Sequence, residues 1–520
     1  MNSETDQSVT SYFLISGILL FLFLFGCSTN SSPDYTLHIE IVPEGAGATS
    51  PQPGGFLEGE NLNLRALPAE NYLFERWEGD LTTISNPADL TMNSDKYITA
   101  VFSRAPLTMG GDGSETNPYL VHSLADLVAI GLEENLDKHY IMVSDIDASD
   151  SRDLQNGSGF QPIGTRERPF TGSFRGDGYT ISSLWIHNQR AGDNAVGFFG
   201  YVKDGLIEDV IIDNRSPNWL NKAEKNLIGR EGQIPLELNY SKADLSNMRG
   251  IGTFVGFNDG GTIRNSVYMG LAGGHIHQGL GGFVGINTGL IENSHFDGNL
   301  SSGSVAGFVV INTGTINQSS AKGIAGGMTG WGFVLTNYGK IDNSFVDMNI
   351  GSANGAAGFV GYHEDGVITS SFASGSISSS IDISGFVLNN NAEISNVYST
   401  ISLEAVDFQA SRKIAGIVFS NKQNGKIDNS YFAGSIDITG SSDFTKAAIF
   451  ENMGTMENIY WDTELSGLND TVVEGSPEGA TGLTTIQMTG PSAEQNMAGF
   501  DWLNIWRTTE DGYPVLRWQE

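Results

Sequence analysis

Cysteine and basic residues are both scarce in this chain of 520 residues. The single cysteine, Cys27, excludes an intrachain disulfide and any metal site that needs several thiolates from one chain. Only 27 lysines and arginines stand against 60 aspartates and glutamates, which gives a formal net charge of -33. Because such an acidic surface repels phosphate backbones and anionic lipid headgroups, nucleic acid is not an expected partner.

Long hydrophobic runs are lacking as well, apart from one at 12–26. A run of this length is short for a membrane-spanning helix and typical of the core of a signal peptide. It ends in the letters LFGC, whose last residue is Cys27, and the polar tether 27–34 follows. This order resembles a bacterial lipobox, which implies a signal peptide at 1–26 and a lipid anchor in the membrane at Cys27. Ser28 then favours an exported outer-membrane lipoprotein at the cell surface, and an uncleaved anchor is the alternative.

A small β module is predicted at 35–104. Alternating apolar residues predict four strands, at 37–42, 62–66, 74–80 and 97–102. Trp77 and Phe102 are expected to fill its small core, and an exposed Trp77 that stacks on a sugar is the alternative. The Gly-Ala-Gly turn, the Phe-x-x-Trp-x-Gly-Asp segment and the closing Thr-Ala-Val-Phe resemble the divergent internalin-type B-repeat, a bacterial repeat domain. The resemblance implies a spacer or adhesive unit of a cell surface.

A repeated pattern of Gly-Phe-Val, Asn-x-Gly and Ile-x-Asn-Ser fills 196–459. Glycine on both sides of the short apolar pairs excludes helices, and one unit is too small to bury its own apolar face, so the units must stack. Two buried columns are expected, at Phe254, Phe283, Phe308, Phe333, Phe359 and Phe386, and at Ile263, Ile291, Ile316, Ile341, Ile368, Ile394 and Ile427. The chain is therefore predicted to be all-β, with a right-handed parallel β-helix (solenoid) that has terminal caps and follows the small β domain.

Asparagine recurs at two turns of the repeat. The predicted columns are Asn258, Asn287, Asn312, Asn337, Asn390 and Asn421 at the first turn, and Asn265, Asn293, Asn343, Asn396, Asn429 and Asn458 at the second. Stacked amides of this kind form structural ladders that satisfy the backbone groups of turns. A regular array that binds sugar or ice is the alternative. His363, Glu364 and Asp365 occupy the first turn of their own unit, which predicts a solvated variant turn rather than an acid–base pair.

The repeat unit resembles the GLUG motif, Gly-x-Phe-Val-Gly-x-Asn-x-Gly-x-Ile-x-Asn-Ser, which occurs in large secreted adhesin-like proteins. The segment 107–195 resembles the N-terminal capping region of such proteins, and a capped amphipathic helix is expected around 123–130. The segment 460–520 resembles the matching C-terminal cap. The resemblance implies an adhesin-like protein of the cell surface.

An insertion at 214–250 interrupts the repeats and is mildly basic in a very acidic chain. Insertions in solenoids project from one face and often contact partners. The candidate partner-binding residues are Arg215, Trp219, Lys222, Lys225, Arg230 and Tyr240. A loop without a function is the alternative.

No motif for a nucleophile, a metal or a phosphate is recognised, so no catalytic residue, metal site or cofactor is predicted. Asp145, Asp147, Asp150 and Asp153 superficially resemble a calcium loop but lack its central glycine and terminal glutamate. The sequence favours a lipid-anchored surface adhesion or scaffold protein that binds glycan, matrix or another protein. A carbohydrate-active enzyme on a β-helix, either a polysaccharide lyase or a glycosidase, is the alternative.

Overall fold

The computed structural model divides the chain into two compact units, Met1–Pro106 and Leu107–Glu520. Each unit has its own hydrophobic core. The structure describes residues 33–69, 72–104, 109–187, 195–215, 227–230, 245, 248–275, 279–352, 354–379, 381–406, 412–439 and 444–519. Cys27 and the apolar run before it lie outside the described residues.

The N-terminal unit consists of two small sheets that share one core. The first has the order β3-β1-β7-β5, built from β1 (Tyr35–Val42), β3 (Gly54–Phe56), β5 (Tyr72–Gly79) and β7 (Lys96–Arg104). The second has the order β2-β4-β6, built from β2 (Gly47–Ser50), β4 (Asn61–Pro68) and β6 (Ala88–Thr91). Apolar residues on alternate positions of both sheets point into the space between them.

Trp77 lies at the centre of this core. Its side chain is 0 % exposed, its ring centroid lies 5.2 Å from that of Phe74, and its indole N–H donates to the Ser85 carbonyl at 3.2 Å. Phe102 is also buried. The prediction that both rings fill the core is therefore confirmed, and a sugar cannot stack on Trp77 in this fold because none of its surface is accessible.

A short helix covers the first turns of the second unit. Helix α1 (Leu124–Ile130) begins after Ser123, whose hydroxyl accepts the backbone N–H of Asp126 at 3.2 Å. Leu127 and Ile130 are fully buried in the solenoid core. The predicted capped amphipathic helix is confirmed, and its apolar face shields the first rung from water. Two 3-10 helices, Glu133–Asn135 and Ser149–Gly157, follow it.

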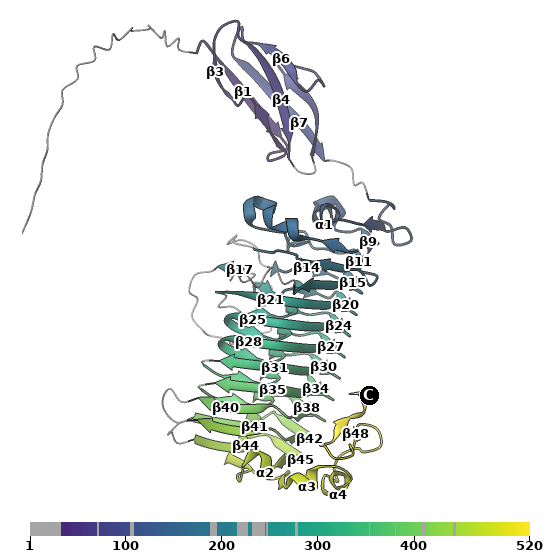
Figure 1. Cartoon of the computed structure of the whole chain (residues 1–520), viewed down its shortest axis with the longest axis vertical. Coiled ribbons are helices and arrows are strands. Elements are labelled where there is room, and N and C mark those ends of the chain that lie inside the picture. The colour runs from purple at the N-terminus through teal and green to yellow at the C-terminus, as the bar shows by residue number, and fades with distance from the viewer. Residues whose placement is uncertain are drawn as a thin grey trace, which may run out of the picture. The chain divides into compact units, whose positions relative to one another are not determined.

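The second unit is a stack of parallel strands, a β-helix, in which each repeat supplies one rung (Figure 1). The first face contains β14 (Phe199–Lys203), β19 (Val255–Asp259), β23 (Val284–Asn287), β26 (Val309–Asn312), β29 (Val334–Asn337), β33 (Val360–His363), β37 (Val387–Asn390), β41 (Arg412–Asn421), β44 (Phe444–Asn452) and β46 (Val472–Gly475). The second face contains β8 (Tyr119–Val121), β9 (His139–Met142), β11 (Ser173–Arg175), β15 (Leu206–Glu208), β20 (Thr262–Arg264), β24 (Leu290–Glu292), β27 (Thr315–Asn317), β30 (Lys340–Asp342), β34 (Val367–Thr369), β38 (Glu393–Ser395), β42 (Lys426–Phe432), β45 (Thr455–Asp462) and β47 (Ala480–Leu483).

The third face includes the two longest strands, β25 and β28, of 12 residues each. It contains β10 (Ile146–Asp147), β12 (Thr180–Ser182), β16 (Ile211–Asn214), β17 (Leu227–Arg230), β21 (Val267–His275), β25 (His295–Ala306), β28 (Ser320–Trp331), β31 (Phe345–Ser352), β35 (Phe372–Ser379), β39 (Tyr398–Ser399), β40 (Ser402–Val406) and β43 (Ile436–Thr439). Short strands precede the first face, namely β13 (Ala195–Val196), β18 (Gly250–Ile251), β22 (Leu280–Gly281), β32 (Ala356–Ala357) and β36 (Ile383–Ser384). Equivalent strands pair in parallel and in register, as Ile291 with Ile316 does. The predicted all-β chain with a parallel β-helix after a small β domain is confirmed.

The interior of the solenoid is filled by the two predicted apolar columns. All of the Phe and Ile residues assigned to them are 0 % exposed. The Phe rings stack face to face with centroid distances between 4.6 Å (Phe254 to Phe283) and 5.0 Å (Phe283 to Phe308). This spacing equals the distance between paired strands, so identical side chains on successive rungs meet at van der Waals contact.

The second turn of each rung needs a left-handed backbone. Asn265, Asn293, Asn343, Asn396, Asn429 and Asn458 all have positive φ, between 44° and 55°. Asparagine tolerates this region better than most residues because its short amide can bond locally. Asp209, Gln318 and Ser370 hold the same position with φ of 57°, 48° and 46°. The second asparagine column is therefore explained first by backbone geometry.

The C-terminal end of the solenoid is closed by short helices and a returning segment. These are α2 (Thr463–Ser466), α3 (Thr485–Met488), α4 (Ser492–Asn496), the antiparallel pair β48 (Trp506–Arg507) and β49 (Val515–Leu516), and the 3-10 helix Arg517–Gln519. Asp462 caps α2 by accepting the N–H groups of Glu464 and Leu465, both at 2.9 Å. Residues 506–519, here called the C-terminal strap, then run back beside the second face towards earlier rungs (Figure 1).

Candidate functional site

The first asparagine column forms a continuous ladder through the first four of its rungs. Each side-chain amide donates to the carbonyl of the next, from Asn258 to Asn287 at 2.8 Å, from Asn287 to Asn312 at 2.8 Å and from Asn312 to Asn337 at 2.7 Å. All four side chains are 0 % exposed. A buried amide without partners would cost about 1–3 kcal/mol, so the ladder provides the partners that burial requires.

The two ends of this ladder differ. The Asn258 side-chain carbonyl has no hydrogen-bond donor among the described residues, because the preceding rung carries Val202 at the equivalent position. At the other end, Asn421 donates to Asn452 at 2.8 Å, and Asn452 donates to the Ser476 carbonyl at 2.8 Å. The column thus begins with an unpaired acceptor and ends on the backbone of the last rung.

His363 occupies an asparagine position of the same column and is fully buried, so the prediction of a solvated turn is wrong for this residue. Its Nδ1 accepts from the Asn337 amide at 3.1 Å, and its Nε2 donates to the Glu393 carbonyl at 3.0 Å. These partners require the neutral tautomer with the proton on Nε2. Burial lowers the pKa of His363 to about 4, although contacts with the backbone of Glu393 and of Asn337 and the charge of Asp365 partly oppose the shift.

A serine column that sequence reasoning missed runs beside the asparagines. Each hydroxyl accepts a backbone N–H from the preceding rung: Ser294 from Ser266, Ser319 from Ser294, Ser344 from Ser319 and Ser371 from Ser344, all at 3.2 Å. Each hydroxyl in turn donates to a carbonyl two residues earlier in its own chain segment, as Ser294 does to Glu292 at 2.9 Å. The signal was present in the sequence as a serine directly after the second asparagine.

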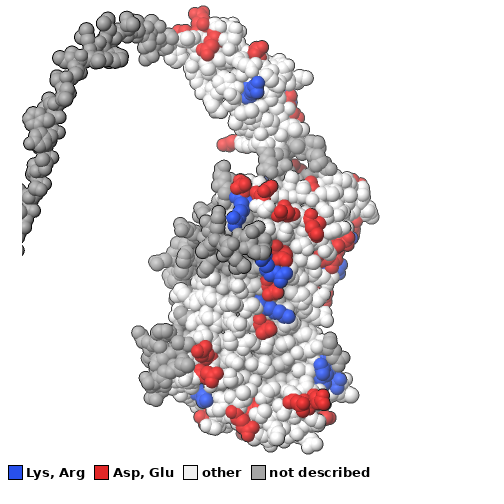
Figure 2. All heavy atoms as spheres, viewed as in Figure 1, with Lys and Arg blue, Asp and Glu red and all other residues white. Residues whose placement is uncertain are grey.

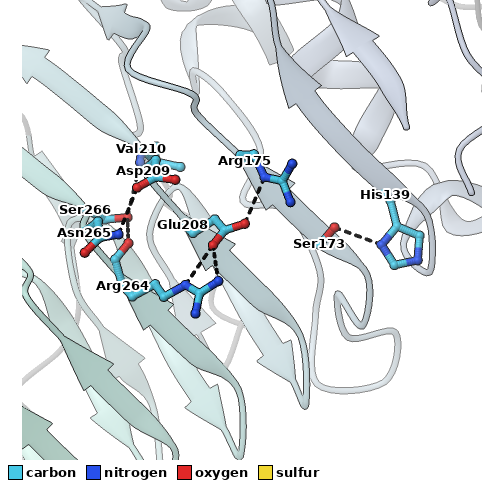
Figure 3. Close-up of polar contacts among 9 residues, drawn as sticks. All are labelled: His139, Ser173, Arg175, Glu208, Asp209, Val210, Arg264, Asn265 and Ser266. Carbon is cyan, nitrogen blue, oxygen red and sulfur yellow. Dashed lines mark hydrogen bonds and ion pairs between the residues drawn. The ribbon is translucent and has the colours of Figure 1, made fainter. Parts of the chain in front are cut away.

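Three charged residues of the second face form an ion-pair cluster on successive rungs (Figure 3). Arg175 Nε donates to one oxygen of Glu208 at 2.9 Å, and Arg264 Nε donates to the other at 2.7 Å. The Glu208 side chain is 8 % exposed, while the two guanidinium groups are 49 % and 45 % exposed. Burial raises the pKa of Glu208, but the hydrogen bonds from Arg264 and Arg175 outweigh it, and the pKa lies below its usual value.

This cluster ties successive rungs together. Asp209 follows Glu208 directly, and Glu292 is the strand partner of Arg264, so carboxylates outnumber guanidinium groups on these rungs. Asp209 accepts from the Asn265 amide at 3.0 Å, which continues the link between the same two rungs (Figure 3). On the rung before Arg175, the His139 Nδ1 lies 2.8 Å from the hydroxyl of Ser173, which belongs to the same strand as Arg175. Parallel register alone places all of these groups side by side.

The candidate partner-binding residues of the insertion are only partly covered by the structure. Arg215 is described: its guanidinium lies 3.1 Å from the Asp213 carboxylate and 3.8 Å from that of Asp297 on a later rung. Arg230 ends strand β17, which pairs in parallel with β21 opposite His275. Trp219, Lys222, Lys225 and Tyr240 lie outside the described residues.

The C-terminal end of the insertion is anchored by Arg166, which sequence reasoning did not identify. Arg166 Nη2 donates to the Met248 carbonyl at 3.0 Å, and its guanidinium lies 5.2 Å from the ring centroids of both Tyr201 and Phe257. The two rings stack on each other at 4.8 Å, and Met248 packs against the same outer apolar cluster. Cation–π contacts and one hydrogen bond therefore fix the point where the insertion rejoins the solenoid.

Two aspartates of the calcium-like segment accept hydrogen bonds from backbone N–H groups. Asp145 accepts the Thr180 N–H at 2.9 Å, and Asp147 accepts the Ser149 N–H at 3.0 Å. In the part of the chain that the structure describes, no group of three or more His, Cys, Asp or Glu side chains is arranged to hold a metal. No helix among the described residues is long and apolar enough to cross a membrane.

Comparison with known proteins identifies the N-terminal unit. Residues 37–106 match the divergent InlB B-repeat domain family, which confirms the predicted N-terminal repeat domain. Halomucin of Haloquadratum walsbyi is 32 % identical over 188 residues, which are 35 % of this chain and 2 % of that protein. A protein of Evansella cellulosilytica with the provisional name Gly-rich membrane protein is 33 % identical over 102 residues, which are 19 % of this chain and 12 % of that protein. The chain thus spans only a small part of either relative.

One solved structure also resembles the chain. It comes from Bacteroides ovatus, and its provisional name is immunoglobulin A1 protease. The match covers 79 % of this chain and 95 % of that chain at 16 % identity, with a TM-score of 0.30. At this TM-score the resemblance does not establish a shared function.

Proposed function

We propose that this chain is an exported cell-surface protein whose solenoid is a non-catalytic scaffold for binding glycan, matrix or protein partners. The observation that carries the proposal is the use of the repeated polar side chains. The asparagine, serine and arginine–glutamate contacts join one rung to the next, so these groups build a stack and are not aimed at a common substrate. Repeat proteins bind partners through the extended surface of the stack and the loops that project from it, and this solenoid offers both.

Surface location is supported by the kinds of proteins that the chain resembles. The N-terminal unit matches a bacterial repeat family, and the relatives carry the names halomucin and Gly-rich membrane protein. The resemblance of the repeats to the GLUG motif and of the first residues to a lipobox agrees with this location. The lipid anchor at Cys27 and the outer-membrane location belong to the proposal.

The sparse charge of the visible face fits a scaffold better than a polysaccharide lyase. Figure 2 shows that acidic and basic side chains lie next to one another on the solenoid and that most of this face carries neither. A lyase must neutralise uronate carboxylates with cations, yet Arg175 and Arg264 are already paired with Glu208. A glycosidase needs two carboxylates free to act as acid and base, and both oxygens of Glu208 are held by guanidinium groups.

Anchoring is tested by metabolic labelling with radioactive palmitate in a bacterial host. We expect label in the wild-type chain and in the matched control Ser28→Ala, and none in Cys27→Ser. Protease added to intact cells should remove the solenoid of the wild-type chain. Label that persists in Cys27→Ser, or a solenoid that resists protease until the cells are broken, would contradict the proposal.

Binding is tested with the chain from Ser28 onwards on arrays of polysaccharides and of extracellular matrix proteins. The wild-type chain is compared with a deletion variant that lacks residues 216–247. This deletion keeps the Arg215 ion pairs and the Arg166–Met248 hydrogen bond. We expect binding by the wild type, a loss of at least tenfold in the deletion variant, and no change in Leu503→Ala, an exposed site in the C-terminal cap. Unchanged binding after the deletion would show that the insertion does not contact the ligand. Release of reducing or unsaturated sugars from any polysaccharide would overturn the non-catalytic function.

A further inference from the structure

The asparagine ladder is interrupted at one place in the stack, between the rung 356–379 and the rung 383–406. His363 stands in the first of these rungs. Its Nε2 donates to the Glu393 backbone carbonyl at 3.0 Å, and among the described residues no hydrogen bond joins it to the Asn390 side chain. The ladder resumes only beyond this point, where Asn390 donates to the next rung at 2.8 Å.

The serine ladder is interrupted at the same place. The hydroxyl of Ser371, in the rung 356–379, accepts the Ser344 N–H at 3.2 Å. The equivalent residue of the rung 383–406 is Val397, which has no hydroxyl to accept from the Ser371 N–H. The Val397 N–H itself bonds to the Ser430 hydroxyl at 3.2 Å, so this ladder also resumes one rung later.

A solenoid opens most easily where the contacts between neighbouring rungs are weakest. One side-chain hydrogen bond changes such a local equilibrium by about 2- to 10-fold. Between these rungs the serine link is absent, and the His363–Glu393 bond stands in place of the amide link. The Ser395 hydroxyl donates to the Thr369 hydroxyl at 3.2 Å. The parallel backbone pairing continues across the interface, and the rings of Phe359 and Phe386 stack at 4.7 Å. The interface is therefore closed but has fewer side-chain links than its neighbours.

The C-terminal strap reaches the rung 356–379 through Trp518. The Trp518 indole N–H donates to the Ser370 carbonyl at 2.7 Å, across 148 positions in the sequence. Its ring also lies 5.9 Å from Phe372 and 6.4 Å from Phe345, measured between centroids. Trp518 therefore holds the N-terminal side of the weak interface.

The same strap holds the rungs on the other side. Gln519 Nε2 donates to the Tyr398 hydroxyl at 2.9 Å, and Trp506 Nε1 donates to the Asn396 side chain at 3.3 Å. The Tyr431 hydroxyl, one rung further, donates to the Pro514 carbonyl at 2.6 Å. Adjacent residues of the strap, 518 and 519, thus contact opposite sides of the interface at which both ladders are interrupted.

We propose that the C-terminal strap is a latch that bridges the weak interface between the rungs 356–379 and 383–406 and keeps the last rungs closed. A cap that only covers the end of the solenoid would need to contact the final strands β45 to β47. The strap instead continues past them to Ser370 and Phe345, where it spans the missing side-chain links. Release of Trp518 then opens this interface before any other, because neither ladder can replace the lost contact.

Hydrogen exchange of the full chain, read by mass spectrometry, tests the latch. In Trp518→Ala we expect about tenfold faster exchange in β37, β38 and the rungs that follow, with unchanged exchange in β23, β26 and β29. Trp518→Phe keeps a ring but removes the indole donor, and it should give an intermediate rate. Leu503→Ala, in the same C-terminal cap but 80 % exposed, is the matched control and should exchange like the wild type.

A repair variant separates the latch from a general loss of stability. His363→Asn together with Val397→Ser rebuilds both ladders across the interface. In the Trp518→Ala background, this repair should return exchange in β37 and β38 to within about twofold of the wild type. The proposal is overturned if Trp518→Ala leaves exchange unchanged, if it accelerates all rungs equally, or if the repaired ladders do not slow the exchange.

Discussion

Protonation of His363 should destabilise the solenoid in mildly acidic solution, and the size of the effect follows from its burial. The ring is neutral in the fold because Nδ1 must accept from Asn337 and Nε2 must donate to Glu393. Its pKa falls from 6.5 to about 4. Between these values the unfolded chain binds a proton that the folded chain does not, so the folded state loses stability as the pH falls from 6.5. The full loss, reached below pH 4, is about 3 kcal/mol.

The assay compares the wild type with His363→Asn, which cannot titrate and restores the amide of the ladder. Urea denaturation is followed by tryptophan fluorescence at pH 7.5 and at pH 5.0, which keeps the chain above its pI of about 4.4. At pH 5.0 the wild type should lose about 2 kcal/mol more than the variant, relative to pH 7.5. Carboxylates titrate in both proteins, so their contribution cancels in the difference. The same pH dependence in both proteins would refute the assignment of a buried neutral imidazole.

Three further outcomes are expected. Val202→Asn should lower the free energy of unfolding by about 1–3 kcal/mol: the new amide can donate to the Asn258 carbonyl, but its own carbonyl is then buried without a donor where Val202 packs in the apolar core, and a gain of stability would contradict the reasoning. Glu208→Gln should lower the free energy of unfolding by about 1–3 kcal/mol at pH 7, because two guanidinium groups lose a buried carboxylate. The difference between the variant and the wild type should shrink as the pH falls, because Glu208 then becomes protonated in both the folded and the unfolded state. Raising sodium chloride from about 0.05 M to about 1 M should raise the Tm in thermal scans, since a net charge of -33 repels itself; a falling Tm would show that attractive ion pairs dominate.

The periodicity of the sequence was sufficient to predict the stack and its core. The Phe and Ile columns can be aligned by eye, and every member that was assigned is buried, because a parallel solenoid must place identical positions above one another. The capped helix after Ser123 and the buried Trp77 could also be predicted, since both depend on local patterns. These features require only that neighbours in sequence or in repeat position become neighbours in space.

Contacts between unlike parts of the chain could not be predicted in the same way. Arg166 meets Met248, and Trp518 meets Ser370, across 82 and 148 positions, and no repeat relates these pairs. The burial of His363 was missed because a histidine in an asparagine turn can be solvated or buried, and only the neighbouring rungs decide which. The Arg175–Glu208–Arg264 cluster depends on strand register, which shifts all side chains if it slips by one residue.

The fold of this protein can be predicted from its repeats, because the repeat period dictates stacking and the apolar columns dictate which side of each strand is buried. The acidic charge and the asparagine turns could also be predicted from the sequence, since they depend on composition and on local backbone preference. The position of the weak interface and the contacts that hold it closed depend on long-range packing and are seen only in the folded chain. The C-terminal strap lies across the ladder interruptions at His363 and Val397. Its contacts there join residues that are far apart in the sequence, so no local sequence pattern predicts them.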